Sequence, residues 1–268
     1  GRLTPGGAHF APRHMPVRPT VPSLLFCEPQ ALVQHNFQAL ADLFSHVLPQ
    51  GEFDSRVKNS FLYKGSVFAV GDQVFNHSIN SHLIASANFS RHGLSLITLG
   101  RSRVTAQEPK LIQTFYEGLL SPPGADLRFE TSLEQLTGSL HITFDMARLR
   151  RVSLAMQGDA APVPPPAGDR VMRVALRHGT VDLRHLFLLK TQQIDACGAD
   201  PTLLLAAGFD DQVYRLLAIA LQPEVFLQAH LSRADHSASH RPQLMAAFED
   251  YVEAYFREPI TLTQIEMV

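Results

Sequence analysis

The segment from Phe61 to Phe144 constrains the fold most, because short β-branched and aromatic runs alternate there with polar turns. The runs are "FLYKGSVFAVG", "QVFNHSI", "HLIASANF", "GLSLITLG", "LIQTFYEGLL", "DLRFETS" and "SLHITFD". Seven or eight short strands at regular intervals favour an antiparallel sandwich or barrel over a parallel sheet with intervening helices. A chain of 268 residues is also long enough to bury the core of such a barrel.

Helical patterns flank the strand-rich segment. Before it, "EPQALVQHNFQALADLFSHVLP" (28–49) repeats apolar residues near helical spacing, which predicts one amphipathic helix. After it, Asp145 is the predicted N-cap of a helix, "MARLRRVSLAMQG", that ends at Gly158. The four prolines of "DAAPVPPPAGD" (159–169) then predict a stiff linker. Because helical patterns follow to the end, we expect an α+β protein: an antiparallel β-barrel or sandwich followed by an α-helical subdomain.

Charge and cysteine content exclude several classes of protein. A formal net charge of -2 gives no overall basic field for nucleic acid or an anionic membrane. Cys27 and Cys197 lie far apart, which argues against a disulfide framework and for a reducing compartment. No apolar run approaches the roughly 20 residues of a membrane span, and the N-terminus has no signal-peptide pattern. We therefore expect a cytoplasmic protein without membrane contact, preceded by a disordered leader over residues 1–20.

Few side chains in the sequence suit catalysis or metal binding. The signatures G-x-x-x-x-G-K-[ST], G-x-G-x-x-G, G-x-S-x-G and H-E-x-x-H are absent. His77 and His82 are the best metal candidates, but a spacing of five places them on opposite faces of a single strand. We interpret them as turn histidines on a surface loop, His141 as a satisfied strand residue, and the arginines of "MARLRRV" as a solvated helix face. The sequence predicts no catalytic residue, no metal ligand and no cofactor.

Two sets of apolar side chains predict interaction sites. Aromatic residues on the strands are core by default, but some would line a ligand pocket if the barrel has a cavity. The candidates for this lining are Tyr63, Phe68, Phe89 and Phe115. The helical patterns between about 183 and 222 carry apolar stripes that must pack on the barrel, on each other or on a second copy of the chain. The candidates for self-association are Leu186, Leu189, Val213, Leu216 and Leu217.

The C-terminal stretch "FEDYVEAYFREPITLTQI" resembles the start of the DNA-binding domain of the AraC/XylS transcription regulators of bacteria. In that family a proline follows the first helix, and "ITL" leads into the helix that begins the first helix-turn-helix. The resemblance assigns Thr261 as the cap of this helix, and Leu262 and Ile265 as its core positions. Pro259 and Thr261 independently predict the end of one helix and the start of another. Upstream, "ASANFSRHGLSLITLGRS", "FYEGLLSPPGADLRF" and "SLHITFDMARLRRVSLAMQG" are similar to the family's partly open, cupin-like sensor barrel.

Composition and the resemblance together divide the chain into five parts. Residues 1–20 are the leader, 21–158 a cupin-like sensor barrel with flanking helices, and 159–169 the Pro-rich linker. Residues 170–240 are a helical dimerisation subdomain, and 241–268 are the truncated start of the helix-turn-helix domain.

Two features depart from the family pattern. Glu266 stands where a small residue is usual, and the chain ends at Val268, before the recognition helix that would enter the major groove. The leading hypothesis is therefore the sensing and dimerisation portion of such a regulator. It would not be an enzyme; it would form a homodimer, have a small molecule as candidate effector, and contact DNA only through the missing C-terminal domain. Two alternatives stay open: a cupin-type metalloenzyme with His77 and His82 as ligands, and a stand-alone sensor that acts by forming heterodimers with a full-length relative.

Overall fold

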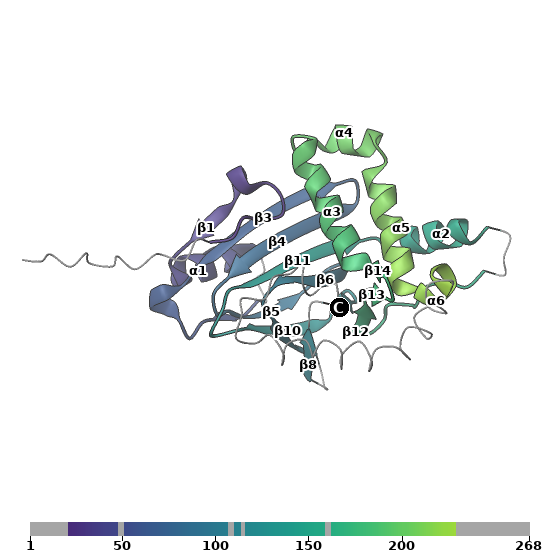
Figure 1. Cartoon of the computed structure of the whole chain (residues 1–268). Coiled ribbons are helices and arrows are strands. Elements are labelled where there is room, and N and C mark those ends of the chain that lie inside the picture. Colours follow the sequence, from purple (N-terminus) through teal and green to yellow (C-terminus); the bar gives the residue numbers. More distant parts are fainter. Residues whose placement is uncertain (1–20, 48–50, 107–109, 114–115, 159–161, 229–268) are drawn as a thin grey trace, which may run out of the picture.

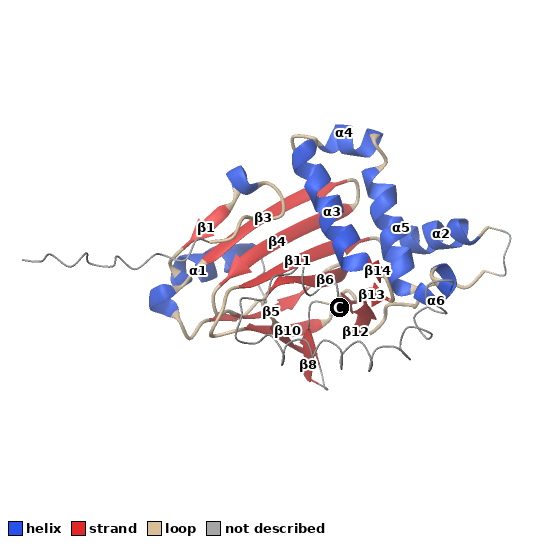
Figure 2. Ribbon diagram, viewed as in Figure 1, coloured by secondary structure: helices blue, strands red, loops and turns tan. Residues whose placement is uncertain are grey.

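The computed structural model describes residues 21–47, 51–106, 110–113, 116–158 and 162–228 (Figure 1). Within these ranges two antiparallel sheets face each other, and helices cover the outer side of the larger one (Figure 2). The predicted α+β class is confirmed.

The larger sheet has seven strands. In spatial order they are β1 (Leu32–Gln34), β3 (Tyr63–Val70), β4 (Gln73–Asn80), β11 (Thr137–Phe144), β6 (His92–Leu99), β9 (Glu117–Ser121) and β12 (Met172–Ala175). The smaller sheet is made of β2 (Phe53–Asp54), β5 (Ile84–Asn88), β10 (Asp126–Thr131), β7 (Ser102–Ala106) and β8 (Lys110–Gln113). A separate two-stranded ladder joins β13 (Arg177–His178) and β14 (Val181–Asp182).

The helical elements lie before, between and after the strands. The α-helices are α1 (Phe37–Val47), α2 (Met146–Gln157), α3 (Leu183–Ala196), α4 (Pro201–Ala206), α5 (Phe209–Leu221) and α6 (Pro223–Phe226). Two short 3₁₀ turns are η1 (Glu28–Gln30) and η2 (Lys58–Ser60). Asp145 caps α2 as predicted, because its side chain accepts a hydrogen bond from the backbone N–H of Arg148. No helix in the described ranges is long and apolar enough to cross a bilayer.

The larger sheet has two chemically different faces, because successive side chains of a strand point to opposite sides. In β11, Leu140, Ile142 and Phe144 are buried in the core formed with the helices. The intervening Ser139 and His141 face the smaller sheet. Strand β4 pairs with β11 along its whole length and repeats this alternation. One face of the sheet is therefore apolar and the other is polar.

Helices α2, α3, α4 and α5 cover the apolar face and share one hydrophobic core with it (Figure 1). Helix α5 contributes most, and its Phe209, Val213 and Leu217 are almost completely buried. The Pro-rich segment does not separate this layer from the sheet, because the chain returns after it as β12 at the sheet edge.

Strands occur at two places where the sequence pattern predicts helix. "VMRVALRH" contains β12, in which Val174 is buried and Met172–Ala175 pairs with β9. The expected helix over 28–49 begins only at Phe37, because Leu32–Gln34 pairs with β3. In both cases an available sheet edge outweighs the weak local preference for helix. The predicted run "LIQTFYEGLL" also contains parts of two strands, β8 and β9.

An ionic network joins the helices to the β3–β4 turn. The guanidinium of Arg148 lies 3.2 Å from Asp72 and 2.6 Å from Asp210, and its central carbon is 4.6 Å from the ring centre of Tyr214. The Tyr214 hydroxyl donates to Asp72 over 2.9 Å and accepts from the N–H of Asp145 over 2.9 Å. The prediction of a solvated arginine face is therefore wrong for Arg148, which links α2, α5 and the sheet.

The chain segment before β1 is fixed on the helix-covered side of the sheet. Phe26 is fully buried in the main core. The N–H of Leu25 donates to Nδ1 of His77 over 3.2 Å, and the N–H of Cys27 donates to Asp195 of α3 over 2.8 Å. The segment thus contacts both the sheet and the helix layer, on the side away from the polar face.

Candidate ligand-binding cavity

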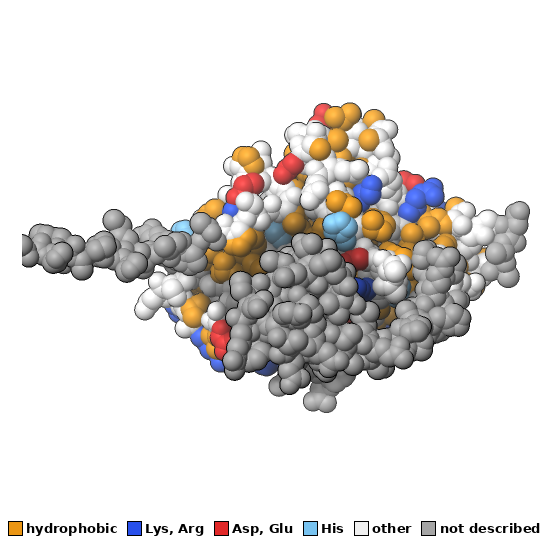
Figure 3. All heavy atoms as spheres, viewed as in Figure 1, with side chains coloured by type: hydrophobic (Ala, Val, Ile, Leu, Met, Phe, Trp, Pro, Cys, Tyr) orange, Lys and Arg blue, Asp and Glu red, His pale blue; other side chains and the backbone are white. Residues whose placement is uncertain are grey.

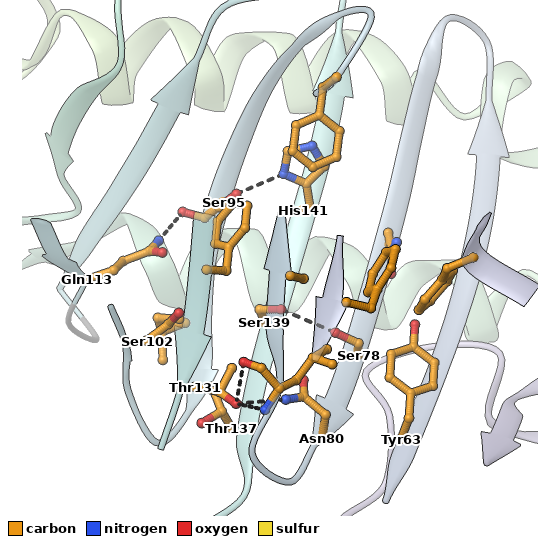
Figure 4. Close-up of a pocket in the computed structure, with 18 residues that line it drawn as sticks. Tyr63, Ser78, Asn80, Ser95, Ser102, Gln113, Thr131, Thr137, Ser139 and His141 are labelled. Carbon is orange, nitrogen blue, oxygen red and sulfur yellow. Dashed lines mark hydrogen bonds between the residues drawn. The ribbon is translucent and has the colours of Figure 1, made fainter. Parts of the chain in front are cut away.

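A cavity of about 180 Å³ lies between the two sheets. Its lining comes from the inner face of the larger sheet, from the smaller sheet and from α1 (Figure 4). The lining residues are Phe44, Phe53, Tyr63, Asn76, Ser78, Asn80, Leu83, Ala85, Phe89, Ser95, Ile97, Ser102, Gln113, Phe129, Thr131, Thr137, Ser139 and His141.

The larger sheet supplies a polar wall. Alternate positions of β4 place Asn76, Ser78 and Asn80 on the cavity, and alternate positions of β11 place Ser139 and His141 beside them. Period-two alternation produces this wall directly, since every intervening residue points to the helices. A β-barrel interior is commonly filled by apolar side chains, so hydroxyl and amide groups in this place favour binding of a polar ligand.

Aromatic side chains form the facing wall. Phe44 of α1 stacks on Phe53 of β2 with ring centres 5.0 Å apart, and meets Tyr63 edge-on at 5.4 Å. Phe129 of β10 and Phe89, which follows β5, extend this wall along the smaller sheet. Aromatic faces are suited to the apolar side of a flat ligand.

His141 stands in a fixed position at one end of the cavity. Its ring stacks on Phe89 with ring centres 4.4 Å apart, and its Nδ1 lies 2.8 Å from Oγ of Ser95. The other edge of the ring touches Gly93, where an added Cβ would lie 2.3 Å from Cε1 of His141. Its Nε2 is buried and has no hydrogen-bond partner among the described residues. Burial lowers the pKa of His141 to about 4, so the ring is neutral near pH 7.

Further hydrogen bonds hold the polar wall in place. The side chain of Gln113 donates to the carbonyl of Ser95 over 2.6 Å. At the other end, the amide of Asn80 donates to Oγ1 of Thr131 over 3.1 Å, which connects the two sheets (Figure 4). Ser78 and Ser139 bond to each other across β4 and β11 over 3.3 Å. These side chains are already oriented before a ligand binds.

The side chains that line the cavity within the described ranges are uncharged. They include no lysine, arginine, aspartate or glutamate. Burial raises the pKa of Tyr63 to about 12, so its hydroxyl is protonated near pH 7, where His141 is neutral. Arg101 and Arg103, on either side of the lining residue Ser102, line an adjoining groove that shares Ser102 and Thr131 with the cavity. Arg103 pairs there with Glu130 at 3.3 Å.

The aromatic residues predicted to line a pocket are divided by the structure. Tyr63 and Phe89 line the cavity. Phe68 belongs to the main core instead, because its position in β3 points to the helices and not to the smaller sheet. Phe115 lies outside the described residues, as do Thr261, Leu262 and Ile265 of the expected helix-turn-helix.

The prediction that His77 and His82 lie on a surface loop is wrong, because both are buried. His77 lies within β4, and His82 lies in the turn between β4 and β5. The two ring nitrogens of His77 are taken up by the N–H of Leu25 at 3.2 Å and by Oγ1 of Thr98 at 3.0 Å. Nδ1 of His82 accepts from the N–H of Arg56 over 3.2 Å. Within the described ranges, no group of three or more metal-ligating side chains comes together.

The residues predicted for self-association also fall into two groups. Val213 and Leu217 are fully buried inside the chain's own core, and Leu216 packs against it, so α5 uses its stripe within the chain. Leu186 and Leu189 of α3 are 38% and 42% exposed. Of the five predicted residues, Leu186 and Leu189 are therefore the two that offer an apolar surface to another molecule.

Comparison with known proteins relates the fold to that of a regulator. No protein-family model matches the sequence, and no curated protein matches it. Among solved structures, the AraC-like transcriptional activator CuxR is similar at a TM-score of 0.50 and 11% identity, over 71% of this chain and 69% of that one. The EutQ protein of Clostridium difficile matches over 34% of this chain and 73% of its own, with 9% identity and a TM-score of 0.28. A cupin superfamily protein from Desulfitobacterium hafniense matches over 31% and 76%, with 16% identity and a TM-score of 0.27. At such identities the likeness to CuxR concerns the fold alone.

Sequence reasoning missed the polar wall, although a signal for it is present. In "VFNHSIN" the small polar residues Asn76, Ser78 and Asn80 occupy every second position. His77, which lies between Asn76 and Ser78, is the residue that suggests a metal site, but its side chain points to the helix-covered face. Polar residues at a strict period of two, within an otherwise apolar strand, indicate a polar interior surface.

Proposed function

We propose that this chain is the effector-sensing and dimerisation portion of a bacterial AraC/XylS-type transcription regulator, with the cavity as its effector site. The observation that carries the proposal is the uncharged, preorganised cavity in a chain that shares its fold with an AraC-like activator over 71% of its length. The similarity of "EPITLTQI" to the start of that family's DNA-binding domain supports a transcriptional output.

The chemistry of the lining supports binding over catalysis. Ser95 and His141 form a hydroxyl–imidazole pair at 2.8 Å, but the described lining holds no carboxylate that would orient the imidazole. With a pKa of about 4, His141 is also a weak base near pH 7. A ligand would therefore be held and released unchanged.

The connection of β11 to α2 supplies a route from the cavity to the helices. His141 lies on the cavity in β11, and the strand runs directly into Asp145, which caps α2. Arg148 in the first turn of α2 is bound to Asp210 of α5. A ligand that favours one position of β11 would shift the populations of helix arrangements. This is how we propose that the effector changes the regulator's output.

We propose that dimers form through α3. Leu186 and Leu189 are exposed there, and Leu203 and Leu205 of the adjacent α4 are 51% and 41% exposed. Figure 3 shows hydrophobic side chains on this part of the surface. The double variant Leu186→Glu/Leu189→Glu should sediment as a monomer where the parent protein sediments as a dimer. The control is Leu133→Glu, at a leucine that is 51% exposed in a different region; a monomeric parent protein at high concentration would refute the dimer.

The regulator function is tested in the host by replacing the gene with a Ser139→Leu version. The leucine side chain would fill the polar wall of the cavity, so it should abolish the response to the effector while the protein stays folded. We expect a defined set of transcripts to change in the deletion strain and to lose effector control in the Ser139→Leu strain. Unchanged transcripts in both strains, measured by RNA sequencing, would rule out a regulator.

A further inference from the structure

The cavity disfavours an anionic ligand on electrostatic grounds. A carboxylate or phosphate that leaves water must be paired with a cation or with several strong donors, otherwise the desolvation cost dominates. Among the described residues, no lysine or arginine lines the cavity, and the imidazole of His141 is neutral near pH 7. Arg101 and Arg103 line the adjoining groove, where Arg103 is paired with Glu130 and Arg101 is exposed. The described lining offers a cationic ligand no carboxylate either.

Polar groups that lack a partner lie on the cavity beside those that are already bonded. Ser95, Gln113 and Thr131 are engaged with protein atoms. Nε2 of His141 is buried there without a hydrogen-bond partner among the described residues. The hydroxyl of Tyr63 (Figure 4) and the half-buried amide of Asn76 also line the cavity, and neither makes a side-chain hydrogen bond within the described ranges. Because a buried polar group without a partner is costly, these groups favour a ligand that can both donate and accept.

The two walls also define the shape of the ligand. Phe44, Phe53 and Phe129 offer apolar ring faces. The opposite wall carries amides, hydroxyls and one neutral imidazole, together with the apolar Ile97. The volume of about 180 Å³ is slightly larger than that of an engineered apolar cavity of about 150 Å³ that binds benzene. This space suits a molecule built on a single ring.

We propose that the cavity selects an uncharged, single-ring molecule that carries hydroxyl or amide groups on one side and an apolar face on the other, and that it rejects the corresponding carboxylates and phosphates. This inference rests on the proposed function, because it names the chemistry of the effector. Asn76 and Tyr63 donate to and accept from the polar side of the ligand, and the phenylalanines of α1, β2 and β10 cover its apolar face.

The test uses matched probes that differ in charge: benzamide against benzoate, and methyl glucopyranoside against glucuronate. They head a panel of several hundred single-ring compounds, half neutral and half anionic, screened by the thermal shift of the 268-residue chain and followed by calorimetry. We expect the compounds that bind to be neutral, with at least tenfold weaker binding of each matched anion. Asn76→Ala should weaken their binding about tenfold or more, and Ser139→Leu should abolish it.

Asn88→Ala, at an exposed residue that ends β5 outside the lining, serves as the control and should leave binding unchanged. Circular dichroism establishes that each variant is folded. Anions that bind as tightly as their neutral partners, hits that ignore both Asn76→Ala and Ser139→Leu, or a panel without hits would each overturn the inference. An anion that binds tightly in the cavity would contradict this inference but leave the regulator proposal intact. Unchanged transcripts in the host would contradict the regulator proposal but not the ligand preference found in the binding screen.

Discussion

The two faces of the larger sheet are built from the same strands but differ in role. On the outer face, Leu140 and its neighbours are sealed under α5, and ion pairs such as Arg148–Asp210 fasten the helices. On the inner face, Ser139 and His141 stand one residue away on the same strand and face a cavity. Because alternate residues of a strand face opposite sides of the sheet, residues that stabilise the fold and residues that contact a ligand can occupy the same strand. A single substitution can then change stability without changing binding, or the reverse.

Neighbouring substitutions in β11 give the sharpest contrast between the faces. Leu140→Ala should lower the free energy of unfolding by about 2 to 5 kcal/mol, because it empties part of a fully buried core. Ser139→Ala should lower it by less than about 1 kcal/mol, since the loss is one hydrogen bond beside a cavity. Urea unfolding followed by circular dichroism measures both. Equal losses would mean that the inner face is as important for stability as the outer one.

Acid should weaken the outer face through His77. Burial lowers the pKa of His77 to about 4 from its ordinary 6.5, while nearby Glu28 opposes this effect and Lys64 adds to it. Between these two pH values the unfolded chain binds a proton that the folded chain does not, so stability falls as the pH falls from 6.5 to about 4. The loss is about 3 kcal/mol for this residue, and His141 adds to it in the same direction.

His77→Gln should reduce the slope of the free energy of unfolding against pH over that window by about half, because His141 still contributes. The exposed His185 gives the matched control, and His185→Gln should retain the full slope. Chemical denaturation at a series of pH values measures the slope. A His77→Gln variant as acid-sensitive as the parent protein would contradict the assignment.

The fastening of the helix layer can be tested at Tyr214. Tyr214→Phe removes the hydroxyl that donates to Asp72 and accepts from the N–H of Asp145, which should cost about 1 to 3 kcal/mol. Tyr116→Phe, at a half-exposed residue, should cost almost nothing. Thermal unfolding of the two variants compares them, and similar midpoints would show that the network adds no stability.

The smallest effect is expected at the cap of α1, which carries Phe44 to the aromatic wall. Asn36 accepts hydrogen bonds from the N–H groups of Gln38 and Ala39, so Asn36→Ala should cost about 1 kcal/mol. The exposed Gln38, when changed to alanine, serves as the control. Hydrogen exchange should show faster opening of α1 only in the first variant. Unchanged exchange in Asn36→Ala would mean that packing alone holds α1.

The fold class could be predicted from the sequence, whereas the short strands at the sheet edges could not. The alternation of apolar and polar residues from Phe61 to Phe144 is strong enough to identify the strands, and Asp145 with Gly158 delimits α2. The short strands β1 and β12 could not be found in this way, because each depends on a neighbour that is distant in sequence. Secondary-structure propensity depends on the local sequence alone and carries no information about such distant neighbours.

The site was harder to predict, because the sequence does not show which set of alternate side chains in a strand faces the cavity and which faces the helices. Tyr63 and Phe68 look alike as strand aromatics, yet an odd spacing of five sends one to the cavity and the other to the core. The Arg148 ion pairs join residues more than 60 positions apart, which no local pattern reveals.

The central claim is that the polar inner face binds a neutral small molecule whereas the outer face only holds the fold. Native mass spectrometry of the protein purified gently from its own host tests this directly, with Ser139→Leu on the inner face and Leu140→Met on the outer face as the matched pair. We predict one bound neutral molecule of single-ring size in the parent protein and in Leu140→Met, and none in Ser139→Leu. The same bound mass in Ser139→Leu, or no bound molecule in the parent protein, would contradict the claim.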